Sequence, residues 1–308
     1  MSQATVTATP DVAKVAGVET PWQRFKSDFL ASKIAIFGLI LMILVLGAAI
    51  LAPWIAPQNP YDIGNLDIFD SKLPPLSKSA DGSMTYWLGT DGQARDLLSA
   101  ILYGMRTSMM VSIVSVAAAL VLGTLVGLVA AYFGGWVDAL LMRIADIQLS
   151  FPSILVALVL LAVLGKGVDK VIIALIIVQW AYFARAARSA ALVERTKEYV
   201  EAARCMSLGS ARVLLRHMLP NCLPPLIVIA TIDLAHAIAL EATLSFLGVG
   251  VPVTEPSLGM LISNGFEFLM GGSYWISFFP GIALALAIIA INLVGDHLRD
   301  ILNPYNAH

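Results

Sequence analysis

The chain has 308 residues, of which 58% are hydrophobic and 13% are charged, and its formal net charge is −2. A mean hydropathy of +0.83 excludes an ordinary soluble globular protein and predicts a multi-pass membrane protein. The two cysteines, Cys205 and Cys222, lie in or beside one basic segment, where neither a disulfide nor a metal site is expected. The phosphate-binding pattern Gly-x-x-x-x-Gly-Lys-Ser/Thr is missing from the sequence, so we expect that this chain binds no ATP and is not an enzyme.

Residues 1–33 are predicted to form a cytoplasmic N-terminal tail. Trp22, Phe25 and Phe29 share one helical face, which fits an interfacial helix on the inner leaflet and equally the first turns of the next helix. Residues 34–53 are apolar and long enough to cross about 30 Å of hydrocarbon. The basic residues before this first span place the N-terminus in the cytoplasm.

Residues 54–103 turn polar and are rich in Pro, Asp, Gly and Ser, which predicts an external insertion of irregular structure. Aspartates outnumber lysines and arginines in this segment, as is typical of a segment outside the membrane. Asp91 and Asp96 beside Arg95 raise the alternative of a cation site, although Ca²⁺ loops need more oxygen ligands at closer spacing.

Five further apolar segments follow in residues 104–295, which we expect to form the core of the membrane domain. Together with the first span they predict an all-α integral membrane protein with six transmembrane helices. The charges of the connecting segments alternate, which places residues 251–273 outside and the tail at 296–308 in the cytoplasm. The predicted later spans are 107–132, 147–165, 171–183, 223–250 and 275–295.

A strongly basic loop at about residues 189–221 connects the fourth and fifth spans, and its charge places it in the cytoplasm. Within it, residues 198–221 carry apolar side chains at helical spacing, and Pro220 is predicted to end that helix. A short amphipathic helix between two spans is typical of a docking element.

Two stretches of this loop, Glu201-Ala202-Ala203 and Arg216–Asn221, resemble the EAA loop of bacterial ABC-importer permeases. The glycine that is usual in that family falls on Ser207 here, with Gly209 two residues further on. The resemblance implies a coupling helix that seats in a groove on a cytoplasmic ATPase; the alternative is a generic amphipathic loop helix. The implied contact centres on Glu201, Ala202, Ala203, Ser207 and Gly209.

A second resemblance lies in the predicted external insertion. Leu88-Gly89-Thr90-Asp91 followed by Arg95-Asp96 resembles a signature of the C-type permease subunit of dipeptide/oligopeptide/nickel importers. The glycine that usually precedes the Arg-Asp pair is Ala94 here, so a left-handed backbone conformation at this position is either disfavoured or not used. The motif residues of this external site are Gly89, Thr90, Asp91, Arg95 and Asp96.

Three ionisable residues, Asp233, His236 and Glu241, lie within the otherwise apolar fifth span. Such groups normally face a bundle interior or a wet cavity, so they are either contacts on a translocation path or structural groups paired with a partner subunit. Residues 241–248 resemble a stretch shared by importers of different substrates, which favours the structural role. The rival class is an ion-coupled secondary transporter with these residues as its relay, which leaves the EAA-like loop unexplained.

The resemblance covers residues from about 22 to 304 and implies the type-I ABC-importer permease fold in a bacterial cytoplasmic membrane. The partners it implies are a homologous B-type permease, two cytoplasmic ATPases that bind ATP and Mg²⁺, an external solute-binding protein and membrane lipid, with no nucleic acid. Such an assembly moves di- or oligopeptides inward by alternating access. Nickel chelates, glutathione and other small solutes remain open as alternatives.

Overall fold

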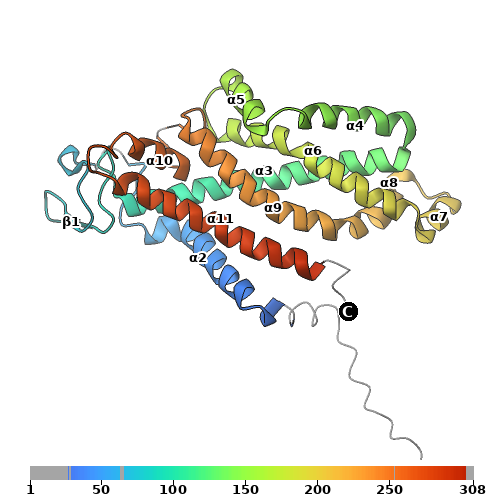
Figure 1. Cartoon of the computed structure of the whole chain (residues 1–308), viewed down its shortest axis with the longest axis horizontal. Helices are drawn as coiled ribbons and strands as arrows, with labels where there is room; N and C mark the ends of the chain where they lie inside the picture. The colour runs from blue at the N-terminus through green and yellow to red at the C-terminus, as the bar shows by residue number, and fades with distance from the viewer. Residues whose placement is uncertain (1–26, 28, 63–65, 253, 303–308) are drawn as a thin grey trace, which may run out of the picture.

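The computed structural model describes residues 27, 29–62, 66–252 and 254–302, drawn in colour in Figure 1. The predicted N-terminal tail and nearly all of the predicted interfacial helix lie outside the described residues, as do residues 303–308 of the predicted C-terminal tail.

The described chain is mainly helical, and its long helices form one elongated bundle (Figure 1). Five helices are long and apolar enough to cross a membrane, and a pair of shorter helices bent by 88° supplies a sixth crossing when counted as one span. The six predicted spans are therefore confirmed with this bent pair as the third. The spanning helices are α2 (Lys33–Ile55), α3 (Leu97–Phe133), the pair α4 (Gly135–Leu149) and α5 (Ser153–Leu164), α6 (Val168–Arg195), α9 (Leu219–Phe246) and α11 (Trp275–Leu302).

The predicted third span, residues 147–165, is wrong in its bounds because the helix breaks inside it. α4 begins at Gly135, and Pro152 separates it from α5. Proline offers no backbone N–H and disfavours helical geometry in the residue before it, here Phe151. The break therefore follows from Pro152, and the crossing consists of two helices at nearly a right angle.

α3 and α6 form the most extensive helix pair of the bundle. A side chain at Gly123 would collide with the Trp180 carbonyl oxygen, and one at Gly127 with the Ala184 carbonyl oxygen. Glycines four residues apart let two membrane helices approach until their backbones touch. α3 also begins well before the predicted second span, so the end of the predicted insertion is already helical.

The loop between α6 and α9 forms α7 (Glu198–Cys205), the single turn α8 (Ser210–Arg212) and the π-helical segment η3 (Val213–Met218). The prediction that Pro220 ends a helix is wrong, because η3 continues directly into α9 through Pro220. A proline ring inside a helix clashes with the turn before it, and the wider π-helical turn at that place relieves the clash.

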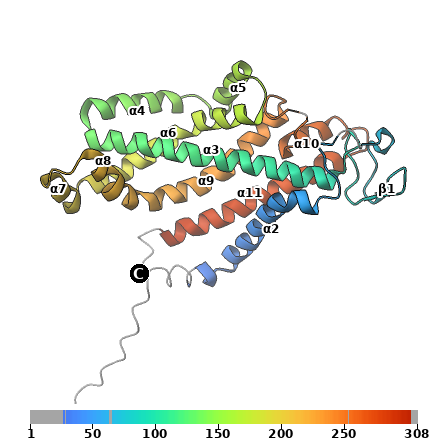
Figure 2. The same ribbon diagram turned by 180° about the vertical axis from the view of Figure 1, so that it is seen from behind.

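The end of the bundle opposite α7 holds the predicted insertion and α10 (Leu258–Phe266), as the two views show (Figures 1 and 2). The insertion contains the 3-10 turn η2 (Ile68–Asp70) and two short antiparallel strands, β1 (Ser77–Lys78) and β2 (Thr85–Tyr86). The start of α2 and the end of α11 lie near each other, on the side away from the insertion (Figure 2). The bundle thus has two distinct polar ends, one built around α7 and one around the insertion.

Candidate functional site

The inner face of α7 fixes this helix to the bundle. Val200 and Ala203, three residues apart and therefore on one side of the helix, are buried in a cluster that includes Leu128, Ala131 and Met218. Because the cluster joins α7 to α3 and η3, α7 is packed against the membrane-spanning helices.

The outer side of α7 faces solvent. The structure places Ala203, with only 2% of its surface exposed, on the inner face and not on the predicted contact surface. Met206 is 68% exposed and adds a large apolar side chain to this outer side. The other four predicted contact residues are all exposed: Glu201, Ala202, Ser207 and Gly209. We call Glu201, Ala202, Cys205 and Met206 the α7 outer face.

Ser207 ends α7 in a left-handed conformation, with φ = 56°. The Leu208 N–H donates to the Ala203 carbonyl over 3.2 Å, and the Ser207 N–H donates to the Arg204 carbonyl over 2.9 Å. These two bonds define a Schellman cap, which usually has glycine at its left-handed position. The backbone at Ser207 therefore has the left-handed conformation that glycine would adopt at this position, although the residue is serine.

A chain of polar side chains ties α7 to α6 and α9. The Tyr199 hydroxyl donates to the Glu194 carboxylate, and the Asn221 amide donates to the Tyr199 oxygen over 2.9 Å. Burial, and then the hydrogen bond to Glu194, raises the pKa of Tyr199 to about 12, so the hydroxyl stays a donor at neutral pH. No sequence pattern predicts this contact, because Asn221 lies 22 residues beyond Tyr199 along the chain.

Two arginines tie the same region to the C-terminal end of α3. Arg195 donates to the Ala131 carbonyl over 2.8 Å, and the Arg204 guanidinium lies 4.7 Å from the centre of the Tyr132 ring. A cation is favoured at the C-terminus of a helix. The guanidinium group of an arginine is also attracted to the π electrons of an aromatic ring. The α7 region is thus attached to α3, α6 and α9 together.

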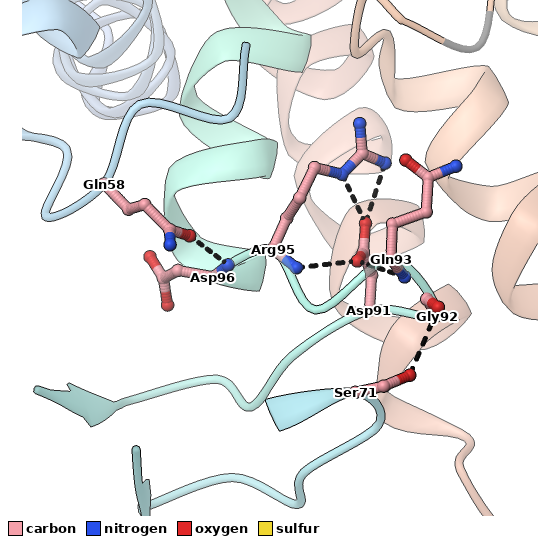
Figure 3. Close-up of polar contacts among 7 residues, drawn as sticks. All are labelled: Gln58, Ser71, Asp91, Gly92, Gln93, Arg95 and Asp96. Atoms are coloured by element: carbon pink, nitrogen blue, oxygen red, sulfur yellow. Dashed lines mark hydrogen bonds and ion pairs between the residues drawn. The ribbon is translucent and has the colours of Figure 1, made fainter. Parts of the chain in front are cut away.

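At the opposite end of the bundle, Asp91 and Arg95 form a buried ion pair (Figure 3). The Arg95 Nε and Nη2 atoms both lie 2.7 Å from Asp91 Oδ2, and the side chains of both residues are 2% exposed. Asp91 Oδ1 accepts the backbone N–H groups of Gln93 and Arg95. In this geometry the Asp91 carboxylate organises a turn and neutralises Arg95.

Asp96 caps α3 and is not part of that pair. Its Oδ2 accepts the Ser99 N–H over 2.8 Å and the Ser99 hydroxyl over 2.6 Å, while its own N–H donates to Gln58 Oε1 (Figure 3). Burial raises the pKa of Asp96, an effect that the Ser99 hydrogen bonds oppose. Between the two aspartates, Ala94 adopts φ = 60°, so the expectation that a left-handed position is unused is wrong. The tight turn set by the Asp91 hydrogen bonds imposes this conformation on a non-glycine residue.

Gly89 and Thr90 join the insertion to the start of α11. The Thr90 hydroxyl accepts the Leu73 N–H over 2.7 Å, and Trp275 Nε1 donates to the Thr90 carbonyl over 3.4 Å. A Cβ at Gly89, where φ is 82°, would lie 2.5 Å from the Leu73 carbonyl oxygen. The external motif is therefore a structural joint between η2, the start of α3 and the start of α11.

The three ionisable residues of α9 do not form one group. Asp233 and His236 lie one turn apart, with Asp233 Oδ1 3.8 Å from His236 Nδ1, and both line a groove beside Tyr182. Glu241 lies about two turns beyond Asp233 and about one and a half turns beyond His236, and it is fully buried. Among the described residues these three side chains form no continuous relay, which weakens the ion-coupled alternative.

The Glu241 carboxyl group lies among serine side chains of this chain. Its Oε1 accepts the Ser245 hydroxyl over 2.7 Å, and the side chains of Ser108 and Ser257 also lie at the carboxyl group. Next to it, a side chain at Gly259 of α10 would collide with the Ala242 backbone. These contacts with Ser108 of α3 and with Ser257, the residue before α10, fit the structural role of Glu241, which stays a prediction.

Comparison with known proteins gives two family models and a set of relatives. A model described as "Binding-protein-dependent transport system inner membrane component" matches residues 123–306, and one described as "N-terminal TM domain of oligopeptide transport permease C" matches residues 20–75. A dipeptide transport system permease protein of Escherichia coli K12 is 41% identical over 92% of this chain and 93% of its own length. A di/tripeptide transport system permease protein of Pseudomonas aeruginosa is 37% identical over 92% of each chain.

A solved structure shares the fold. A chain from the inward-facing MetNI methionine ABC transporter matches 66% of this chain and 96% of its own length, with a TM-score of 0.53 and 21% identity. At that identity the match concerns the fold alone, which is the type-I importer permease fold.

Proposed function

Because this chain belongs to the family of binding-protein-dependent transport system inner membrane components, we propose that α7 is the helix through which it couples to a cytoplasmic ATPase. The chain is a transmembrane permease subunit of an ABC importer. The observation that carries the proposal is the division of α7 into a compact exposed outer face and an inner face packed on the bundle.

The coupling has a physical requirement. Nucleotide can shift the permease only if the ATPase contacts the α7 outer face differently in its two states. Since Tyr199, Arg195 and Arg204 attach this region to α9, α6 and α3, a displacement of α7 acts on three spans at once. In this proposal ATP and Mg²⁺ bind to two partner ATPases, and a homologous second permease completes the translocation path.

The substrates in this proposal are di- or oligopeptides, delivered by an external solute-binding protein. Support comes from relatives named as dipeptide and di/tripeptide permeases, which align over almost the entire chain at 35–41% identity. The membrane is the bacterial inner membrane, with the α7 end in the cytoplasm because the basic residues gather there.

The test replaces Ala202 by Asp. A carboxylate in the centre of the α7 outer face must be desolvated when the ATPase docks, so uptake of radiolabelled dialanine should fall to background. The tagged variant should still enter the membrane and should still be recovered with the second permease, because Ala202 makes no buried contact. The measurements are uptake, membrane content and co-purification of the ATPases.

Two variants are matched controls for Ala202→Asp. Ala202→Ser keeps a small neutral side chain and should transport normally. Ala203→Asp places the same carboxylate on the inner face and should reduce the amount of protein itself, because it buries an unpaired charge. Normal uptake by Ala202→Asp, at a normal level of protein, would contradict the role of α7.

A further inference from the structure

A groove of about 370 Å³ lies between α6 and α9, lined by Tyr182, Ile229, Ile232, Asp233 and His236. Tyr182 stands at the middle of α6, and Asp233 stands at the middle of α9. With a rise of about 1.5 Å per residue, both lie roughly 20 Å from either end of their helices. Because the exposed Arg185–Asp146 ion pair lies one turn beyond Tyr182, the groove lies in the cytoplasmic half of the spans.

Asp233 lacks a full set of partners in this groove. Its side chain is 11% exposed, and its Oδ2 atom accepts no hydrogen bond from the described residues. Its Oδ1 atom lies 3.8 Å from His236 Nδ1, which is beyond hydrogen-bonding distance. A carboxylate at this depth is costly unless a cation or a hydrogen-bond donor reaches it.

The part of this chain that the structure describes supplies no lysine or arginine for that position. α9 contains neither residue type, and the arginines that follow Tyr182 on α6 are engaged with α4 or, for Arg195, with α3. Arg185 pairs with Asp146, and Arg188 pairs with Asp138. None of the described lysines and arginines forms an ion pair with Asp233, which leaves the carboxylate open to a cation from another molecule.

We propose that this groove binds the ammonium group of a peptide substrate during its passage, with Asp233 as the counter-charge. His236 is half exposed beside the carboxylate, and Tyr182 adds an aromatic side chain to the lining, to which a cation can be attracted. Ile229 and Ile232 provide apolar walls for a neighbouring side chain of the peptide. A few polar groups in a mainly apolar hollow of this size are typical of small-ligand sites.

This inference rests on the proposed function, because it places the groove on the path of a peptide importer. The test compares Asp233→Asn, Asp233→Glu and Asp146→Asn in the complete importer with its solute-binding protein, using radiolabelled dialanine. Asp233→Asn should lower the maximal uptake rate by about tenfold, since it removes the charge that binds the ammonium group. The half-saturating dialanine concentration should not change, because the solute-binding protein captures the substrate first.

Asp233→Glu keeps the charge and should retain most of the uptake. Asp146→Asn makes the same chemical change in an exposed ion pair on α4 and should transport like the unmodified protein. Unchanged uptake by Asp233→Asn would overturn the proposal that the groove binds the ammonium group, and would leave the proposed peptide importer standing. An unmodified importer that carries no dialanine would overturn the peptide substrate and the groove with it.

A second measurement identifies what lies in the groove. Replacing Tyr182 by the photoreactive p-benzoylphenylalanine should cross-link radiolabelled dialanine to this chain during ATP turnover, and Asp233→Asn should abolish the label. Cross-linking to the second permease without any peptide label, together with loss of the complex in Asp233→Asn, would overturn the proposal. The cation would then be a lysine or arginine of the other subunit.

Discussion

Ser207 holds a backbone conformation that a side chain disfavours, at the turn that ends α7. A residue with a Cβ pays about 1–2 kcal/mol to adopt the left-handed conformation, and glycine avoids this cost. Glycine also has a more flexible unfolded state, which offsets about 0.4–1 kcal/mol of that gain. Ser207→Gly should therefore stabilise the turn by roughly 0.5–1 kcal/mol. Amide hydrogen exchange of α7 in the purified complex should slow by about two- to fivefold.

Ala202→Gly is the matched control in the same helix. Ala202 is also exposed, but it lies inside α7, where glycine costs about 1 kcal/mol relative to alanine. Exchange should therefore become faster in Ala202→Gly and slower in Ser207→Gly. Faster exchange in both variants would show that the serine hydroxyl, and not the backbone angle, stabilises the turn.

The position of the candidate site could be predicted from the sequence, but the orientation of its side chains could not. The resemblance located α7, but placed Ala203 on the contact surface, although the spacing of Val200 and Ala203 marks a shared buried side. Tyr199 and Asn221 meet only because the chain turns between α7 and α8 before it continues through η3 into α9, and no local pattern encodes that contact. Glu241 could be suspected of a structural role, but its serine partners on α3 and α10 depend on the tertiary packing.

At the scale of elements, the close packing of α3 on α6 depends on Gly127. An alanine there would collide with the Ala184 carbonyl and would place its Cβ 2.7 Å from the Arg188 nitrogen. Backbone atoms cannot move aside as a flexible side chain does, so the two helices must separate. Gly127→Ala should cost about 1–3 kcal/mol or more and lower the thermal unfolding midpoint of the purified complex.

Gly47 of α2 gives the matched control, since no atom lies within 4 Å of a Cβ added there. Gly47→Ala should leave the midpoint unchanged or raise it slightly, because alanine is the better helix former. Equal midpoints for the two variants would mean that the α3–α6 contact is looser than the structure shows.

The spans themselves could be predicted because apolar length alone determines whether a helix crosses the membrane. Their bounds could not, because prolines act differently in different surroundings. Pro152 breaks the third span, whereas Pro220 lies inside a continuous helix that a π-helical turn adapts to it. Both prolines are visible in the sequence, but whether a proline breaks a helix or is accommodated within it depends on tertiary packing, which the sequence does not show.

At the scale of the whole molecule, α3 joins the two polar ends. Asp96 caps its first turn within the external motif, and Arg195 binds the Ala131 carbonyl in its last turn beside α7. Its 37 residues span about 55 Å. Since α6 packs along α3, a movement of α7 has a rigid route to the insertion at the far end of the bundle.

That arrangement requires the two ends to lie on opposite sides of the membrane. Cys205 is exposed on α7 and Cys222 is buried, so a membrane-impermeant maleimide should label Cys205 alone. The positive-inside rule places α7 in the cytoplasm, so labelling should occur in inverted vesicles stripped of peripheral proteins and not in intact spheroplasts. In Cys205→Ser carrying Lys78→Cys, whose new thiol lies on exposed β1, the pattern should reverse. Labelling of both positions from the same side would contradict an odd number of crossings between them, and with it the bent pair of α4 and α5 as a single span.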